Sequence, residues 1–170
     1  MPGLDVRIVR DRRDPAAVQR LLRALPDWFG IEASTQEYVA DAERLPTDLA
    51  YADDQEPAVG ALLVNRHYPE SAEIHLMAVD PAAHRRGVGR ALLAAALSDL
   101  ADDGVRFVQV KTQGPARPDP GYARTLAFYV AEGFSPLEEI IGLWPENPCL
   151  LLVRSVGGPA LTAPAAEQTP

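Results

Sequence analysis

The chain has little cysteine and no long apolar segment, and each scarcity narrows the class of protein. Its 170 residues include one cysteine, Cys149, so no intramolecular disulfide can form and we expect a reducing compartment. No apolar run approaches the roughly 20 residues that span a bilayer. The first residues, MPGLDVRIVRDRRD, contain no apolar signal core. These features predict a cytoplasmic protein without a membrane partner.

Histidine is also scarce, and acidic residues outnumber basic ones. The three histidines, His67, His75 and His84, are scattered and form no metal-ligand spacing, so we predict no metal site. The formal net charge of −8 argues against a nucleic-acid partner, which would require a broad basic surface. The same charge is compatible with a cationic small molecule or a basic peptide.

The hydrophobic pattern predicts eleven elements in the order strand, two helices, three strands, helix, strand, helix, two strands. The strands are expected at 5–10, 48–53, 58–68, 71–80, 104–112, about 137–143 and 149–154, and the helices at 15–25, about 35–45, 87–102 and 122–132. Ser34 or Thr35 could cap the second helix. This order predicts an α/β fold, a sandwich of helices and one mixed sheet, in a single domain over residues 1–154. Residues 155–170 contain few bulky apolar side chains and are expected to be a disordered tail.

The segment VDPAAHRRGVGRALL, residues 79–93, places two glycines and several basic side chains where a strand meets a helix. The N-terminus of a helix presents unpaired N–H groups, and glycine lets an anion approach them. Arg85 and Arg86 add positive charge. The pattern alone leaves two interpretations open, a pyrophosphate site and a glycine-containing turn with solvated arginines. A Rossmann or P-loop site is disfavoured because Leu92 stands where the third glycine would be and no G-K-[ST] follows.

Two motifs together resemble a known family. HRRGVGRALL after AVDP is similar to motif A of the GNAT superfamily, the acetyl-CoA-dependent N-acetyltransferases, with His84 in place of the usual Gln or Arg. TLAFYVAEGF is similar to motif B: Tyr129 and Gly133-Phe134 match, and Thr125 stands where the family has a small residue. The resemblance covers about residues 5–154. It implies a central mixed, mostly antiparallel sheet flanked by helices.

The resemblance implies acetyl-CoA as cosubstrate. The pyrophosphate would lie on the backbone amides of residues 85–90, and the pantetheine arm would pair with the strand before the turn. The cofactor-binding residues it implies are Met77, Ala78, Val79, His84, Arg85, Arg86, Gly87, Val88, Gly89 and Arg90. In this family the strand at 72–79 diverges from the strand at 106–111 to leave edges that a ligand can complete.

Acetyl transfer requires a neutral amine, and only about one lysine-like amine in 2,500 is neutral at pH 7. The resemblance implies Glu73 as the base. His75 lies two residues further, so a regular strand puts both side chains on one face, and either could act directly or through water. The resemblance also implies that Tyr129 protonates the leaving thiolate and that a backbone amide of 77–79 holds the oxyanion. The alternative for Tyr129 is a core aromatic on the helical face that it shares with Tyr122 and Leu126.

The loop PDWFGIEAST follows the first helix, where this family usually contacts the acceptor. Trp28 and Phe29 could pack on an aliphatic chain or a cation, and Glu32 could supply charge. The sequence therefore predicts an N-acetyltransferase that uses direct transfer to a primary amine, carried by a small molecule or a peptide. The alternatives are a non-catalytic acetyl-CoA-binding sensor or interaction module, and a different nucleotide binder. Because GNAT proteins are often dimers, a homodimer is also an expectation.

Overall fold

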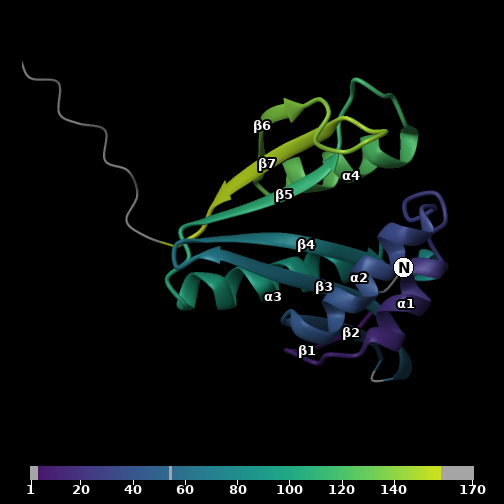
Figure 1. The fold of residues 1–170 in the computed structure, drawn as a ribbon. Helices are drawn as coiled ribbons and strands as arrows, with labels where there is room; N and C mark the ends of the chain where they lie inside the picture. The colour runs from purple at the N-terminus through teal and green to yellow at the C-terminus, as the bar shows by residue number, and fades with distance from the viewer. Residues whose placement is uncertain (1–3, 54, 158–170) are drawn as a thin grey trace, which may run out of the picture.

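A seven-stranded sheet forms the centre of the structure, a computed structural model that describes residues 4–53 and 55–157 (Figure 1). The strands are β1 (Val6–Val9), β2 (Thr47–Ala52), β3 (Gln55–Tyr68), β4 (Ser71–Val79), β5 (Phe107–Gln113), β6 (Ser135–Ile140) and β7 (Cys149–Ser155). The helices are α1 (Pro15–Arg23), α2 (Glu32–Arg44), α3 (Val88–Asp102) and α4 (Pro120–Ala131), with a short 3₁₀ turn at Pro81–Ala83. The strand order is β1-β2-β3-β4-β5-β7-β6, and every pair is antiparallel except β4 with β5. The predicted α/β fold with a mixed, mostly antiparallel sheet is confirmed.

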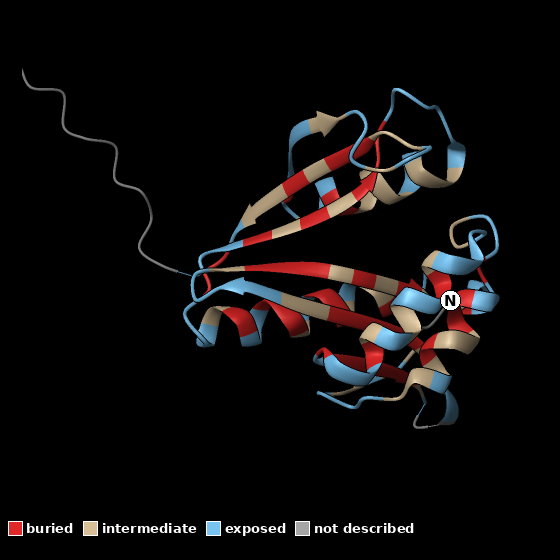
Figure 2. Ribbon diagram, viewed as in Figure 1, coloured by how far each residue is buried: buried red, intermediate tan, exposed pale blue. Residues whose placement is uncertain are grey.

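Helices cover the two faces of the sheet unequally. Helices α1 and α2 pack on one face of the β1–β4 half, and α3 packs on the opposite face of the same half. Helix α4 contacts β5 and β6 and continues the α3 layer. Alternate strand residues enter the two separate apolar cores, which appear as the buried segments of Figure 2. Gly60 lets α3 lie close to β3, because a Cβ there would come within 2.9 Å of both Leu92 and Val88.

The parallel strands β4 and β5 diverge, as expected from the family resemblance. They pair only over residues 71–74 and 107–110, and beyond Ile74 and Val110 they separate into the wedge visible in Figure 1. The register between β3 and β4 also shifts: Val64 pairs with Ile74 and Leu63 with Leu76, so His75 is an extra residue in a β-bulge. The edge of β4 that faces β5 therefore has no strand partner from His75 onward within residues 4–53 and 55–157.

The start of the second helix differs from the prediction. Helix α2 begins at Glu32, and the residue before it, Ile31, provides no side-chain cap. Ser34 and Thr35 lie inside the helix, where the Thr35 hydroxyl donates to the carbonyl of Phe29 at 3.3 Å. The serine-or-threonine cap was therefore wrong. The ion pair of Glu32 with Arg23 on α1 holds this end of the helix instead.

Other boundaries shift by a few residues for local reasons. Helix α4 starts at Pro120, two residues early, because the Asp119 carboxylate accepts hydrogen bonds from the N–H groups of Gly121 and Tyr122. It ends, as predicted, before Gly133, whose φ is +85°. Strand β6 begins at Ser135 and stops at Ile140, earlier than expected at both ends.

The predicted core of the third helix is confirmed. All six of its inward-facing residues are buried: Val88, Leu92, Leu93, Ala96, Leu97 and Leu100. At the C-terminus, Ser155 is the last residue of β7 and Val156 is buried in the core formed with α3. The rest of the predicted tail, residues 158–170, lies outside the described residues.

Candidate active site

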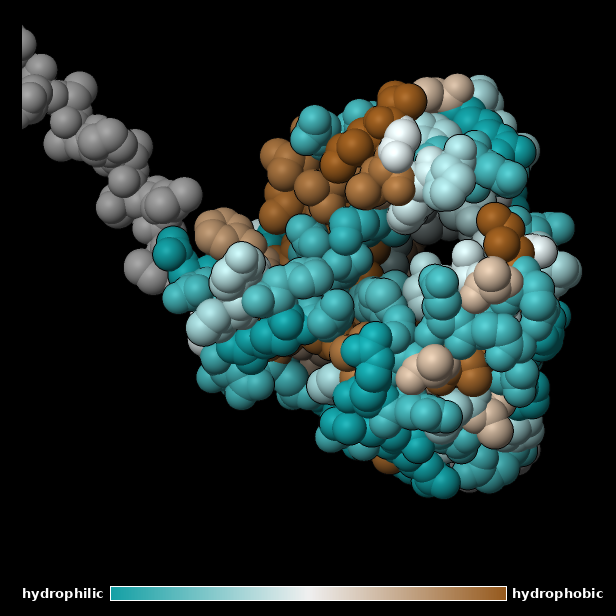
Figure 3. All heavy atoms as spheres, in the orientation of Figure 1, coloured by the Kyte–Doolittle hydropathy of each residue, from teal (hydrophilic) through white to brown (hydrophobic). Residues whose placement is uncertain are grey.

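A cavity of about 1160 Å³ opens where β4 and β5 diverge, and the molecular surface is hollowed between these two parts of the molecule (Figure 3). Its walls come from β4, β5, α2, α4, the loop between α1 and α2, and the turn before α3. The predicted site residues that line it are Trp28, Phe29, Glu73, His75, Met77, Ala78, Val79, His84, Arg85, Gly87, Val88, Gly89, Arg90 and Tyr129. Glu32 and Arg86 are not among the lining residues. We refer to this cavity as the cleft.

The turn before α3 exposes the first amides of the helix. Gly87 is the N-cap residue with φ of +88°, a left-handed conformation that glycine adopts without strain. The first hydrogen bond of the helix joins the N–H of Ala91 to the carbonyl of Gly87 at 2.9 Å. The N–H groups of residues 88–90 therefore have no carbonyl partner within the helix. Together with the positive end of the helix dipole, they form a site suited to an anion.

Gly89 is the residue that best tests whether a phosphate fits here. A Cβ at this position would lie 3.6 Å from Phe128 and 3.8 Å from Met77, ordinary contact distances that the protein itself could accommodate. Glycine instead of alanine costs a helix about 0.5–1 kcal/mol. Since the protein's own packing does not require glycine, the space left open is explained by a group that approaches the backbone closely. The turn thus fits a pyrophosphate.

The charged and aromatic side chains of the turn have different roles. The His84 Nε2 lies 2.8 Å from the carbonyl of Val79, so this ring fastens the turn to the end of β4. The Arg90 guanidinium pairs with Glu132, the residue that follows α4, at 2.7 Å. Arg85, which has φ of +61°, and Arg86 make no ion pair with any described residue. These two are the cations that remain available to an anion.

Glu73 lies within a buried polar network. Its side chain is only 7% exposed, and its carboxylate accepts hydrogen bonds from His67 at 2.7 Å and Gln109 at 3.1 Å. The Lys111 ammonium lies 3.1 and 3.0 Å from its two oxygens. Burial raises the pKa of the Glu73 carboxyl, but the hydrogen bonds from His67, Lys111 and Gln109 outweigh burial, and the pKa falls below its ordinary value. Glu73 is therefore an ionised carboxylate whose Oε2 accepts three hydrogen bonds and whose Oε1 accepts one, from Lys111.

His75 contacts a second carboxylate on a different element. Its Nε2 lies 2.6 Å from Asp41 Oδ2 of α2, and its ring packs against the edge of Tyr38 with centroids 5.4 Å apart. Arg44 pairs with the other oxygen of Asp41. The bulge keeps His75 on the same side of the sheet as Glu73, toward α2, as the sequence predicted. The two candidate bases thus share a face but have separate partners.

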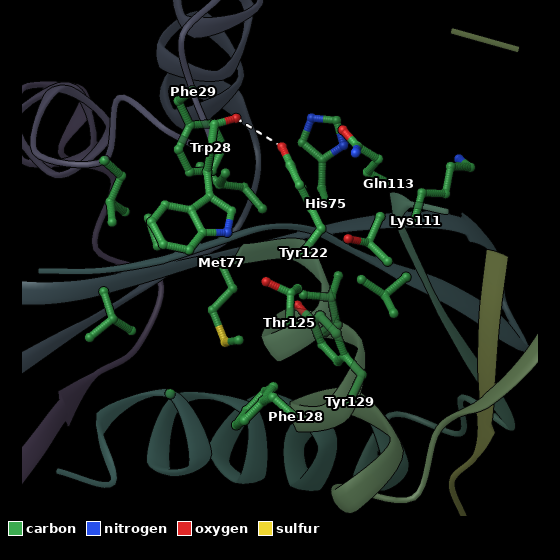
Figure 4. Close-up of a pocket in the computed structure, with 18 of the residues that line it drawn as sticks. Trp28, Phe29, His75, Met77, Lys111, Gln113, Tyr122, Thr125, Phe128 and Tyr129 are labelled. Carbon is green, nitrogen blue, oxygen red and sulfur yellow. Dashed lines mark hydrogen bonds between the residues drawn. The ribbon is translucent and has the colours of Figure 1, made fainter. Parts of the chain in front are cut away.

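Tyr129 combines features of a core residue and of a site residue. Its ring lies between Phe128 and Phe134, with centroid distances of 5.3 and 5.4 Å, and the residue is only 4% exposed. No described residue hydrogen-bonds to its hydroxyl, and the residue lines the cleft beside Thr125 and Phe128 (Figure 4). Burial raises the pKa of this phenol well above its ordinary value. The hydroxyl is therefore protonated and free to donate into the cleft.

A contact across the cleft joins the α1–α2 loop to α4. The Tyr122 hydroxyl donates to the carbonyl of Trp28 at 3.0 Å, the dashed line of Figure 4. The Trp28 indole packs over Gly121 and lies edge-on to His84, with ring centroids 6.2 Å apart. Phe29 points toward Tyr38 instead, with centroids 5.9 Å apart.

Glu32 lies away from these aromatic residues. Arg23 donates to its carboxylate at 2.6 Å, and Gln36 donates at 2.8 Å. Hydrogen bonds from Arg23 and then Gln36 lower the pKa of Glu32 to about 2. Its charge is used within the protein, at the start of α2.

Sequence reasoning missed Asp41, His67, Lys111 and Tyr122. Lys111 is the only lysine of the chain, and that count is the one sequence signal that could have drawn attention to it. The contacts themselves leave no local signal, because Asp41 lies 34 positions from His75 and Lys111 lies 38 positions from Glu73. Among the described residues, no group of three or more His, Cys, Asp or Glu could hold a metal ion. No helix within 4–53 and 55–157 is long and apolar enough to cross a membrane.

A helix end suited to an anion, the edge of β4 beyond its pairing with β5 and a buried phenol thus lie in one cleft. A family model described as the acetyltransferase (GNAT) family matches residues 15–132. The chain belongs to the GNAT family of acetyltransferases, which are acyltransferase enzymes that use acetyl-CoA. No curated protein matches the sequence significantly.

Solved structures share the fold at low sequence identity. The ribosomal-protein-S18-alanine N-acetyltransferase from Escherichia coli is 16% identical with a TM-score of 0.73, over 93% of this chain and 98% of that one. A GNAT family acetyltransferase from Elizabethkingia anophelis with acetyl-CoA bound is 15% identical with a TM-score of 0.70, over 89% and 99%. The IAA acetyltransferase from Bacillus cereus is 21% identical with a TM-score of 0.67, over 89% and 100%. At these identities the likeness concerns the fold.

Proposed function

We propose that this protein is an N-acetyltransferase that moves the acetyl group of acetyl-CoA directly to a primary amine in a ternary complex. The observation that carries the proposal is that the cradle at Gly87 and Gly89, the unpaired edge of β4 and the Tyr129 hydroxyl all meet in one cleft. Each of the three would serve a different part of the same reaction. We also propose that the protein acts in the cytoplasm.

The chain would hold the cosubstrate mainly through its backbone. The amides of residues 88–90 would bind the pyrophosphate, with Arg85 and Arg86 of the same turn as cations available to it. Met77, Ala78 and Val79 would offer backbone groups to the pantetheine arm, as an edge strand does. When bound, acetyl-CoA supplies an acetyl group activated as a thioester. The β4 amides beyond the bulge could donate to the thioester oxygen as negative charge develops on it.

Tyr129 would supply the proton that the leaving thiolate needs. Because burial keeps this phenol in its neutral form, its O–H is available to hydrogen-bond to the departing sulfur and to deliver the proton as the thiol forms. No residue that the structure describes hydrogen-bonds to its hydroxyl and competes with this role.

Direct transfer is favoured because the obvious covalent alternative is missing from the cleft. An acetyl-enzyme intermediate would need an accessible nucleophile. The only cysteine, Cys149, is 0% exposed, does not line the cleft, and has a thiol whose pKa is raised by burial. The acceptor amine would therefore attack the thioester itself.

The acceptor would enter from the α2 side, where Phe29, Tyr38 and the candidate bases lie. The fold relatives include a ribosomal-protein-S18-alanine N-acetyltransferase, so a peptide amine belongs in any panel beside small amines. The alternative function is a non-catalytic acetyl-CoA-binding module on the same fold. The unpartnered Tyr129 hydroxyl favours the enzyme, since a sensor has no use for a proton donor beside the thioester.

The test is thiol release from acetyl-CoA with small amines, amino acids, polyamines, aminoglycosides and peptides, combined with mass measurement of the product. We expect one amine class to gain an acetyl group as free CoA appears. Calorimetry of acetyl-CoA runs in parallel. Saturable binding without turnover on any amine would support the non-catalytic module, and absence of binding would exclude both.

A further inference from the structure

The cleft contains two candidate bases on β4, Glu73 and His75, and they differ in their hydrogen-bond partners. Glu73 accepts hydrogen bonds from the side chains of His67, Gln109 and Lys111. The Lys111 ammonium contacts both of its carboxylate oxygens. The ammonium of Lys111 therefore already occupies the position at Glu73 that a protonated acceptor amine would take. A carboxylate whose charge is already balanced by an adjacent ammonium is poorly placed to remove a further proton.

His75 is occupied at one nitrogen only. An ionised carboxylate accepts but does not donate, so the 2.6 Å contact with Asp41 requires the proton of the ring on Nε2. Nδ1 then carries the free lone pair, and no described residue hydrogen-bonds to it. The His75 side chain is 23% exposed and lines the cleft near Gln113 and Tyr122 (Figure 4).

The position of Asp41 is fixed from two sides. Its Oδ1 pairs with Arg44 one turn later on α2, and its side chain is 15% exposed. Tyr38 packs its edge against the His75 ring from the same helix. The bulge in β4 projects His75 toward this helix. The bulge and the side chains of α2 together fix the orientation of the His75 ring.

We propose that His75 accepts the proton of the acceptor ammonium, and that Asp41 is the positioning residue that fixes its tautomer and stabilises the imidazolium. This inference rests on the proposed acetyl transfer and assigns its base. In this scheme Glu73 and Lys111 form a structural and electrostatic pair next to the reaction, without exchanging protons with the substrate.

The protons and bonds balance as follows. Nδ1 of His75 takes one proton from the ammonium and releases it to solvent through the open cleft. The neutral amine then forms a C–N bond to the acetyl carbon, and the C–S bond breaks. The thiolate gains a proton from Tyr129, while the second proton lost by the nitrogen restores Tyr129 through His75 or water. One proton leaves the site in each turnover.

Titratable groups on several elements line the cleft together with His75 and bear on any pH profile. They include Glu37, Tyr38 and Asp41 on α2, His67 on β3, Glu73 on β4, Lys111 on β5 and Tyr122 on α4. The test must therefore separate the Asp41–His75 pair from a general change of charge. Glu43 offers a matched control, because it is an exposed carboxylate on the same helix that does not line the cleft.

The experiment compares His75→Asn, Asp41→Asn, Glu73→Gln and Glu43→Gln in the full-length protein, with an amine that the wild type acetylates. We expect His75→Asn to lower kcat about 100-fold near neutral pH, with acetyl-CoA affinity within about twofold of wild type. Asp41→Asn should lower kcat about tenfold and move the acidic limb of the kcat profile about one pH unit lower, because the imidazolium loses its carboxylate. Glu43→Gln should change neither quantity, and Glu73→Gln should leave the position of the limb unchanged.

A second readout does not depend on turnover. Nitrogen NMR of the imidazole groups should show His75 as the Nε2–H tautomer in the wild type, and a loss of that preference in Asp41→Asn. The proposal is overturned if His75→Asn keeps wild-type kcat, if the acidic limb disappears only in Glu73→Gln, or if His75 is the Nδ1–H tautomer. If the wild type acetylates no amine, the proposed function fails by itself, while the tautomer still reports on the Asp41–His75 pair.

Discussion

The α3 side of the cleft, formed by residues 77–79 and 84–90, is built mainly from backbone, whereas the α2 side depends on paired side chains. On the α3 side the functional groups are amides at a helix end and a strand edge, which the fold exposes by geometry alone. On the α2 side, Glu73 and His75 each rely on partners from other elements. The first side can bind a phosphate with few side chains, and the second can specify a proton path only if its pairs are intact.

The largest effect of a substitution is expected on the α3 side of the cleft. Gly89→Asp should weaken acetyl-CoA binding by about 100-fold or more, because it puts bulk and negative charge against the amides that would hold the pyrophosphate. The measurement is calorimetry with acetyl-CoA. Ser98→Asp makes the same charge change on an exposed position of α3 away from the cleft and should leave affinity unchanged. An unaltered dissociation constant in folded Gly89→Asp would place the pyrophosphate elsewhere.

The next largest effect is expected at Tyr129, where a substitution should change the rate of the chemical step but not the affinity for acetyl-CoA. Tyr129→Phe should lower kcat about 10–100-fold with little change in acetyl-CoA affinity, because the ring packing stays and only the donor is removed. Steady-state kinetics and calorimetry on one preparation check this. Unchanged turnover would remove Tyr129 from the mechanism and leave it as a core aromatic residue.

The backbone side and Tyr129 were predictable from sequence because their signals are local. Gly87 and Gly89 lie three and five positions after His84, and the motif around Tyr129 falls within one helix and its C-terminal glycine. The inward face of α3 was predictable for the same reason, since 3.6-residue periodicity needs no knowledge of the partner surface.

The side-chain pairs were not predictable, because they depend on tertiary features. Asp41 meets His75 because α2 packs over the face of the sheet that His75 occupies in the β4 bulge, although the two residues lie 34 positions apart. Lys111 reaches Glu73 because β4 and β5 run parallel up to Ile74 and Val110. Neither the bulge nor the register leaves a pattern in the sequence.

A third prediction concerns the contribution of Glu73, on the α2 side of the cleft, to the stability of the fold. The pKa of Glu73 is held below its ordinary 4.5, so its ionised form stabilises the folded state above that pH, and the contribution is lost as pH falls through the folded value. The free energy of unfolding of Glu73→Gln should therefore be about 1–3 kcal/mol lower than that of wild type near pH 7. This difference in the free energy of unfolding should shrink as pH falls below 4.5. Denaturant unfolding at several pH values measures it.

Glu138→Gln is the control for this series. Glu138 is an exposed carboxylate on β6, and its replacement should change stability by less than about 0.5 kcal/mol. If the gap between wild type and Glu73→Gln is the same at pH 7 and pH 3, the network around Glu73 does not act through its charge.

The smallest effect is expected where the two sides meet. Tyr122→Phe removes the hydrogen bond to the Trp28 carbonyl but keeps the aromatic ring, so stability should fall by about 0.5–1.5 kcal/mol. Turnover should change by less than about threefold, since the contact spans the cleft without entering the chemistry. Thermal melting and kcat measure the two effects. A loss of turnover as large as that of Tyr129→Phe would assign Tyr122 a direct role.

The most direct test of acetyl transfer in a ternary complex is the initial rate measured while acetyl-CoA and the acceptor amine are both varied. Reciprocal plots that intersect are predicted, because both substrates must occupy the cleft before acetyl leaves, and the acetylated amine should appear in equal amount to free CoA. Parallel lines, together with a protein that gains the mass of one acetyl group before amine is added, would contradict direct transfer.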